Sequence, residues 1–529
     1  MRFRIYLFLF LLGIGCVLIV AIFQDAPGYM DADYYYAIGL RLNRGNGFNE
    51  PFLWNYLDNP NGIPHPSNTY WMPLPSVLAF LGMYLTGFEG FATAKIGFLL
   101  LSGFIPVVTA ALSYGITEQR DQALLSGILA SIPAFYLPYL GTTDSFSVII
   151  VLGGLWFLVV CNSHRISYKP FGFILGIISG LIHLTRADGV VWLLLAFLAI
   201  LLATSARWSR SGQGISLLKR TLALIYCFAG YGIIVAPWIV RNQNVIGTWF
   251  STAGIKTLWL TVYDELYAYP ASLLNIEHWW QSGLVEIINV RLYAMGQNLQ
   301  TILAVQGEIF LLPLLLVGLW IYRKNLAVQM GIFGWLVTFL VMTFAFPLVG
   351  WRGGYFHSGA ILQCLLWAMV PVGFARFIDW GVQVRRWNGK QAGNIFKVAM
   401  VSIALILTAF IVNQRVIGGN LTNPTWGQGM VAYEKLGWAL RNMGAVDSDI
   451  FLVNNAPGFF LASGMQTLSV PHGNVETTLQ VAQRYGGDYL LLERNHPSGL
   501  ADLYIQPGDR PGLKYLKKIG ETQVYQIEK

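Results

Sequence analysis

Eleven apolar runs, most of them 16 to 23 residues long, recur along this chain of 529 residues. An α-helix rises roughly 1.5 Å per residue, so runs of this length can cross the hydrocarbon core of a bilayer. Only 11% of the residues are charged, whereas an ordinary soluble domain has about 25%. The sequence therefore predicts a polytopic α-helical membrane protein with about 11 transmembrane helices, at residues 5–23, 95–116, 123–140, 145–161, 171–184, 189–204, 221–240, 303–322, 328–349, 358–377 and 398–412.

Basic residues concentrate in alternate loops between these runs, which is typical of loops on the cytoplasmic side. The first run follows Arg2 and Arg4, is longer than the ~7–15 residues of a signal-peptide core, and lacks a small-residue cleavage site, so we expect a retained helix. With the N-terminus in the cytoplasm, eleven crossings place the C-terminus outside the cytoplasm. The inner loops would then carry Arg120, Arg165, Lys169, Arg207, Arg210, Lys219, Arg220, Arg323, Lys324, Arg385, Arg386, Lys390 and Lys397.

The net charge of +8 belongs to this topology pattern, because the basic residues are scattered between apolar runs. It does not indicate a nucleic-acid partner. All four cysteines lie inside apolar runs, which argues against a disulfide framework or a zinc site. The absence of a GxxxxGK[ST] motif argues against a nucleotide-driven pump.

The composition changes after residue 412, where the chain becomes polar and short strand-like segments alternate with helical ones. This alternation predicts a small α/β domain. We expect two domains: a transmembrane domain at 1–412, with outer loops at 24–93 and 241–302, and a soluble extracytoplasmic domain at 413–529. The strand-like segments are DIFLVNN, QTLSV, DYLLLER and TQVYQIE.

The loop at residues 28–75 carries Asp31 and Asp33 where the chain should leave the membrane. Acids at this depth are costly to keep unless they are paired or used, so both are candidate site residues. Helix capping is the alternative, because an Asp before a helical segment is a common N-cap. A further apolar stretch at 74–85 is too short to span the membrane, and we expect a juxtamembrane or re-entrant helix there.

Asp144 follows a predicted outer helix end, on the same side of the membrane as Asp31. It too could simply cap a helix, but two acids at equal depth favour a shared site. Three arginines lie at the same level and could bind a phosphate in bidentate fashion or extend to lipid headgroups. They are Arg186, Arg241 and Arg352.

Several short motifs together resemble the GT-C superfamily of integral-membrane glycosyltransferases, which includes protein O-mannosyltransferases, aminoarabinose transferases and oligosaccharyltransferases. The resemblance covers roughly the first 410 residues and rests on the order of these motifs and on their common side. The motifs are DADYYYAIG (31–39), PHPSNTYWMPLP (64–75), LGTTD (140–144), LTRADG (184–189), APWIVRNQNVIG (236–247) and RGGYFHSG (352–359).

The resemblance implies transfer of a sugar from a polyprenyl-phosphate donor, with inversion, on the outer face of the membrane. Many relatives carry adjacent Asp and Glu in the first loop. Here Ala32 separates Asp31 from Asp33, so the match is ambiguous, and we prefer Asp31 as the base with Asp144 as its support. Some relatives use a divalent metal and others do not, so a metal remains possible and no ligands are assigned. The expected phosphate-binding residues are Arg352, Arg241, His65 and Arg186, and the expected cavity residues are Tyr34, Tyr35, Tyr36, Trp71, Tyr355 and His357.

The resemblance thus implies an inverting glycosyltransferase of the plasma membrane, acting in the cell envelope on a glycan, lipid or protein acceptor. The alternative is a non-enzymatic membrane protein, either a transporter or a lipid-binding scaffold for envelope polysaccharide assembly. A secondary transporter usually places ionisable residues near the bilayer midplane and contains repeats. Here the charges lie at the predicted outer helix ends and no repeat is visible, which favours the enzyme.

Overall fold

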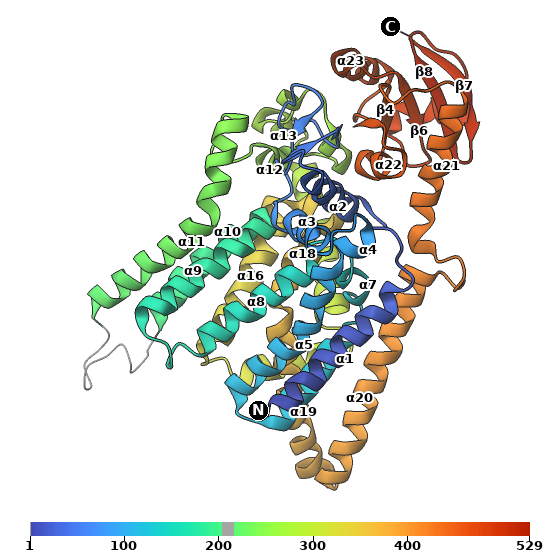
Figure 1. Cartoon of the computed structure of the whole chain (residues 1–529). Coiled ribbons are helices and arrows are strands. Elements are labelled where there is room, and N and C mark those ends of the chain that lie inside the picture. The colour runs from blue at the N-terminus through green and yellow to red at the C-terminus, as the bar shows by residue number, and fades with distance from the viewer. Residues whose placement is uncertain (1, 204–215, 529) are drawn as a thin grey trace.

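A computed structural model describes residues 2–203 and 216–528 (Figure 1). Seven helical segments in this part of the chain are long and apolar enough to cross a membrane, which confirms the predicted helical membrane class. Thr204, Arg207 and Arg210, named in the predicted topology, lie outside the described residues. The seven segments are Phe3–Ala21, Phe91–Thr117, Tyr168–Thr185, Leu217–Ile246, Leu326–Ala345, Pro347–Arg385 and Gly389–Ile417.

The predicted number of eleven spans is not established, because several apolar runs form shorter or interrupted helices. The run at 123–140 is divided: α6 (Arg120–Ser131) ends before Pro133, and α7 (Leu137–Leu140) follows. Proline disfavours helical backbone at the residue before it, which explains this end. The run at 303–322 is also broken, because α14 (Leu284–Thr301) continues through a π-helical turn to Gln306 and α15 (Leu312–Ile321) begins six residues later.

The first long loop forms a helical platform at one end of the bundle (Figure 1). Helix α2 (Met30–Asn43) packs on α3 (Leu74–Thr86), the short helix expected at 74–85. Gly39 permits this close approach, since a Cβ atom there would lie 2.8 Å from the Cβ of Ala79. The second long loop is partly helical, because α11 (Leu217–Ile246) and α14 extend into it from both sides.

A six-stranded sheet forms the centre of the C-terminal domain, with the order β2-β5-β4-β6-β8-β7, in which β2 is Phe52–Leu53 of the first loop. The three strands β5 (Gln466–Ser469), β4 (Ile450–Val453) and β6 (Tyr489–Leu492) are parallel neighbours. Strands β8 (Thr522–Ile527) and β7 (Leu513–Ile519) add an antiparallel hairpin beside β6. Four of these strands fall in the predicted segments, and β7 was not anticipated.

Helices cover both faces of this sheet. On β4 (Ile450–Val453), Phe451 and Val453 pack in an apolar cluster with Phe459 of α22 (Ala456–Ser463). The same cluster includes residues of α21 (Gln428–Asn442). The intervening residue, Leu452, packs in a separate cluster with Val481 of α23 (Val475–Tyr485). This alternation is the period-two pattern of a strand buried on both faces. It explains the continuous apolar sequence of β4.

The first loop and the C-terminal domain are joined through the sheet itself. Strand β2 (Phe52–Leu53), from the first loop, pairs in parallel with β5. The indole of Trp426 also donates a hydrogen bond to the carbonyl of Ala26 at 2.9 Å. The division at residue 412 remains a prediction, but one sheet contains strands from both sides of it.

Candidate active site

Three residues that are far apart in the sequence meet at the start of α2. Asp31 is in the first turn of α2, Asp144 is in the turn before α8 (Phe146–Cys161), and His357 is on α18 (Tyr355–Gly359). The Nε2 atom of His357 lies 3.7 Å from Oδ2 of Asp31, and its Nδ1 atom lies 3.9 Å from Oδ1 of Asp144. We call these three residues the acid–histidine cluster.

Asp144 is held firmly within this cluster. It is 1% exposed, accepts a hydrogen bond from the Tyr29 hydroxyl at 2.6 Å, and accepts another from the backbone N–H of Ser145. Burial, followed by the charge of Asp144, raises the pKa of Tyr29 well above its ordinary value, so the phenol remains a donor. The Ser145 hydroxyl lies 3.2 Å from Nδ1 of His357, whose ring stacks on Phe146.

Asp31 is more open than Asp144, with 32% of its side chain exposed. Removal of its carboxylate from water raises its pKa, and the nearby charge of Asp144 raises it further, whereas Arg186 opposes both effects. Partial exposure tempers this shift. A carboxylate with a raised pKa is a better base near neutral pH than an ordinary one, and Asp31 is the exposed acid of the pair.

The donor set of the cluster also fits a divalent metal ion. One ligand atom from each of the three residues lies within 4.8 Å of the others. Carboxylate oxygens and imidazole nitrogens bind ions such as Zn²⁺ at about 2.0–2.2 Å, so three ligands need only small movements to share one ion. The sequence assigned no metal ligands, and the structure identifies these three as candidates.

Asp33 is separated from the cluster, because residues two apart on a helix face different directions. Its Oδ2 atom accepts a hydrogen bond from the Asn455 side chain of α22 at 2.8 Å, and the residue is 4% exposed. Burial raises the pKa of Asp33 to about 7, an effect that the hydrogen bond from Asn455 partly offsets.

The predicted cavity tyrosines occupy different surroundings. Tyr34 is 1% exposed, and its hydroxyl donates to Glu50 at 2.7 Å, while Tyr36 packs against Phe91. Tyr35 is buried, and after burial the charges of Asp144 and Asp31 are the next largest causes that raise its pKa. Of the three tyrosines, Tyr35 is therefore the one whose pKa the two acids of the acid–histidine cluster raise most directly.

Two other predicted cavity residues are held by packing. The Trp71 ring is partly buried and stacks on Trp54, with 3.9 Å between ring centroids. Tyr355 is fully buried, and its hydroxyl lies 3.4 Å from the side-chain carbonyl of Gln306. Of the cavity residues predicted from the sequence, His357 is the one that joins the cluster directly.

Arg186 is the predicted arginine that acts on the cluster. Its Nε donates to Asp188 at 2.9 Å and its Nη2 donates to the Ser358 hydroxyl at 3.2 Å, so it is fixed beside His357. Its positive charge also lowers the pKa of Asp31. A guanidinium in this position can stabilise negative charge that develops near the cluster.

Arg352 has a different environment. Its guanidinium lies 4.8 Å from the ring centroid of Tyr263 and 4.7 Å from that of Trp351. Within residues 2–203 and 216–528, no hydrogen bond or ion pair satisfies this guanidinium. Gly353 beside it has φ 128°, a conformation that favours glycine. Arg352 therefore presents free donors.

The other two predicted phosphate ligands make local contacts. Arg241 donates to the carbonyl of Phe48 at 3.0 Å and lies over the ring of Trp238. His65 is buried, and its Nε2 lies 2.9 Å from Oδ2 of Asp58. The Arg241 contact joins α11 to the first loop, and the His65 contact lies within that loop. Neither residue contacts the cluster within the described part of the chain.

Sequence reasoning missed several partners of the cluster. Tyr29, Ser145 and Ser358 each stand beside a predicted site residue, and their neighbourhood was the only signal in the sequence. Tyr263 lies in the second loop, and both Asp31 and Arg352 affect its pKa, which burial raises to about 12. Nothing in the sequence joins that loop to the first one.

No family model and no curated protein matches the chain. Two solved membrane transferases are similar to it in fold. ArnT from Cupriavidus metallidurans, bound to undecaprenyl phosphate, is 10% identical with a TM-score of 0.56, and the match covers 99% of this chain and 98% of that one. The Archaeoglobus fulgidus oligosaccharyltransferase, tethered to an acceptor peptide, is 11% identical with a TM-score of 0.57, covering 95% and 70%. The chain has the GT-C fold.

The GT-C fold confirms the predicted architecture, a polytopic helical membrane protein with a C-terminal α/β region. The oligosaccharyltransferase is also similar in a complex with Zn and sulfate, with a TM-score of 0.54 and 11% identity. At these identities the likeness concerns the fold.

Proposed function

We propose that the chain is an inverting glycosyltransferase that uses a polyprenyl-phosphate-linked sugar. The observation that carries this proposal is the convergence of Asp31, Asp144 and His357 at the bundle end that faces the C-terminal domain. The GT-C fold supports the same class of reaction, since ArnT has been solved with undecaprenyl phosphate. The proposal names the chemical class of the donor and of the reaction, and no individual sugar, acceptor or lipid chain length.

In the proposed reaction an acceptor hydroxyl attacks the anomeric carbon from the face opposite the phosphate. Asp31 takes the hydroxyl proton as the new C–O bond forms. The bond between the anomeric carbon and the phosphate oxygen breaks, and the polyprenyl phosphate leaves with the electron pair. Asp144, fixed by Tyr29 and Ser145, keeps the negative potential that raises the basicity of Asp31, and the Ser145 hydroxyl positions His357.

The leaving phosphate needs positive charge that is already in place. Arg186 is oriented by Asp188 and Ser358, while Arg352 carries donors without a protein partner in the described residues. Preorganised donors of this kind stabilise a developing anion without reorganising. If a divalent cation binds the cluster, it would supply further charge stabilisation to the phosphate or the acceptor oxygen.

Direct binding of the lipid tests this proposal without knowledge of the sugar. The full-length protein in nanodiscs is titrated with undecaprenyl phosphate and followed by native mass spectrometry. We expect saturable binding that an excess of phosphatidylglycerol does not displace and that Arg186→Ala weakens. Binding that phosphatidylglycerol displaces equally well would contradict a dedicated polyprenyl-phosphate site.

A further inference from the structure

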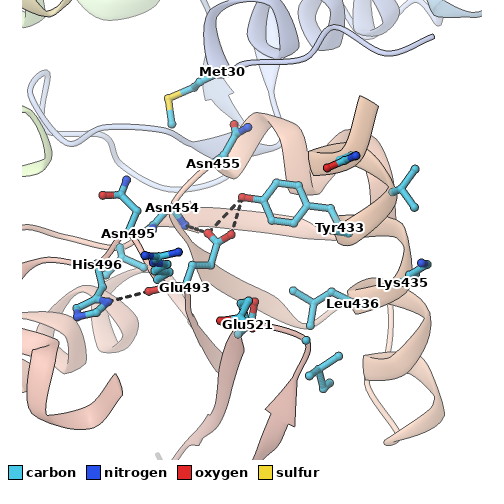
Figure 2. Close-up of a pocket in the computed structure, with 18 of the residues that line it drawn as sticks. Met30, Tyr433, Lys435, Leu436, Asn454, Asn455, Glu493, Asn495, His496 and Glu521 are labelled. Atoms are coloured by element: carbon cyan, nitrogen blue, oxygen red, sulfur yellow. Dashed lines mark hydrogen bonds between the residues drawn. The ribbon is translucent and has the colours of Figure 1, made fainter. Parts of the chain in front are cut away.

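A cavity of about 950 Å³ lies at one edge of the sheet in the C-terminal domain, outside the acid–histidine cluster (Figure 2). It is found where three parallel strands end. Asn454 follows β4, His472 follows β5 after a short turn, and Glu493 follows β6, and all three line the cavity. Its volume is within the range of small-ligand sites.

The position of this cavity matches a general property of α/β sheets. The chain leaves β4 through α22 to reach β5 on one side, and then crosses through α23 to β6 on the other side. The strand order therefore reverses between β4 and β6. Ligands bind in the crevice at the carboxyl ends of strands at such a switch point. Here the backbone N–H of Asn454 donates to Glu493 at 3.2 Å across it.

The polar atoms in the cavity are those of a site for a hydrogen-bonding ligand. The Nδ2 atom of Asn454 and the Nδ1 atom of His472 are buried and lack a hydrogen-bond partner among the described residues. Buried polar groups are normally paired, so these two atoms are open positions for a ligand. Asn495 and His496 add further donors and acceptors on the loop after β6 (Figure 2).

The same crevice is poorly suited to a phosphate. The N-terminus of α22 is already occupied, because the Asn455 side chain accepts a hydrogen bond from the backbone N–H of Gly458 at 3.1 Å. The Glu493 carboxylate accepts from Tyr433 at 3.0 and 3.2 Å. The lining has three acids and two cations, an excess of negative charge that would repel an anion: Asp264, Glu493 and Glu521 against Lys435 and Arg494. Apolar surface from Met30 and Leu436 lies beside these polar groups. This combination fits a neutral molecule with many hydroxyl groups.

The cavity adjoins the acid–histidine cluster through the start of α2. Met30 lines the cavity. The residue after it, Asp31, belongs to the cluster, and the residue before it, Tyr29, donates a hydrogen bond to Asp144 of the cluster. Asn455, another lining residue, is hydrogen-bonded to Asp33. We infer that this cavity binds the acceptor of the transfer reaction, a neutral oligosaccharide. The acceptor role rests on the proposed function, whereas oligosaccharide binding itself does not.

Binding to the full-length protein in nanodiscs tests this inference. The probes are maltotetraose, cellotetraose and the tetramer of N-acetylglucosamine, followed by saturation-transfer NMR, with undecaprenyl phosphate binding measured on the same preparations. Asn454→Ala removes the free amide, and Asn495→Ala changes an exposed lining residue without disturbing the core. Gln480→Ala, at an exposed position of α23 that does not line the cavity, is the matched control.

We expect at least one tetrasaccharide to bind, and each cavity variant to weaken it about tenfold, the usual effect of losing one good hydrogen bond. The control variant should bind like the wild type, and undecaprenyl phosphate binding should be unchanged in all variants. If no tetrasaccharide binds, or if the cavity variants bind as well as the wild type, the inference is overturned. If oligosaccharide binds but undecaprenyl phosphate does not, the cavity assignment stands and the proposed transferase function falls.

Discussion

The side-chain amide of Asn455 donates a hydrogen bond to Oδ2 of Asp33 at 2.8 Å, across 422 residues of sequence. Two residues before Asp33, Asp31 faces the other way, toward Asp144 and His357. The first turn of α2 is therefore shared between the acid–histidine cluster and the C-terminal domain. One acid of the pair belongs to the cluster, and the other joins the domain to it.

Replacing Asp33 should change the pH dependence of stability. Burial raises its pKa from 3.8 to about 7, so the folded protein binds a proton that the unfolded chain releases between these values. Stability is therefore lost as the pH rises through this window and levels off above about 7. Asp33→Asn removes the penalty but keeps an oxygen that can accept from Asn455.

The gap in melting temperature between Asp33→Asn and the wild type should thus be larger at pH 8 than at pH 5, as measured by differential scanning fluorimetry. Asp447→Asn is the control, because its side chain is 84% exposed. An Asp33→Asn gap that does not change with pH would show that the Asp33 carboxylate is not buried as described.

Arg352→Lys should weaken undecaprenyl phosphate binding, because lysine lacks the planar fork that binds phosphate in bidentate fashion. Arg323→Lys is a matched control, since Arg323 also lies over a tryptophan, Trp320, at 4.3 Å. Native mass spectrometry with undecaprenyl phosphate measures both. Equal undecaprenyl phosphate binding by Arg352→Lys and the wild type would indicate that the Arg352 side chain extends to the lipid headgroups instead of binding the donor phosphate.

The metal question can be answered without an activity assay. After dialysis against a chelator, calorimetric titration with Mn²⁺ or Zn²⁺ should give one site per chain if the cluster binds a metal. Asp144→Asn and His357→Ala should then weaken that site at least tenfold, since the first removes the charge of one ligand and the second removes a ligand altogether. His278→Ala provides a control, because His278 pairs with Glu265 elsewhere. Unchanged metal binding by His357→Ala would show that the metal ion binds outside the acid–histidine cluster.

We predict that the C-terminal domain lies outside the cytoplasm. The turn between α19 (Gln363–Arg385) and α20 (Gly389–Val412), which contains basic residues, lies at the end of the bundle opposite the C-terminal domain (Figure 1). Positive residues concentrate on the cytoplasmic side. A reporter that is active only in the cytoplasm should therefore be silent when fused after residue 529. A strong signal from that fusion would reverse the predicted orientation.

The helical membrane class and most strands of the C-terminal domain followed from patterns that are local in the sequence. Apolar length predicts spans, and short apolar segments between turns predict strands. The count of spans did not follow, because Pro133 and the break after Gln306 interrupt apolar runs. Strand β2 could not be predicted either, since two residues carry no periodic signal and their partner β5 is more than 400 positions away.

The site was anticipated only in part. Acids near the membrane edge marked Asp31 and Asp144, but their meeting with His357 depends on how three separate segments pack. The sequence did not distinguish Arg241 from Arg186, and His65 was a phosphate candidate only through the resemblance to the GT-C superfamily. The contacts of Arg241 with Phe48 and of His65 with Asp58 depend on the path of the first loop, which no local pattern encodes.

The central claim is that Asp31 is the base of a sugar transfer. Transfer from a synthetic polyprenyl-phosphate sugar by Asp31→Asn is its most direct measurement, with expression and thermal stability checked for each variant. We predict a loss in turnover of ~10²–10⁴-fold, the usual contribution of a general base, with little change in donor binding. Wild-type turnover should rise with pH through the raised pKa of Asp31 and then level off.

Asp33→Asn is the internal control and should cost much less turnover, because Asp33 faces Asn455 rather than the cluster. If Asp33→Asn abolishes transfer while Asp31→Asn stays active, Asp33 is the base and the assignment is wrong. Near-normal transfer by the double variant would contradict a catalytic role for this turn altogether.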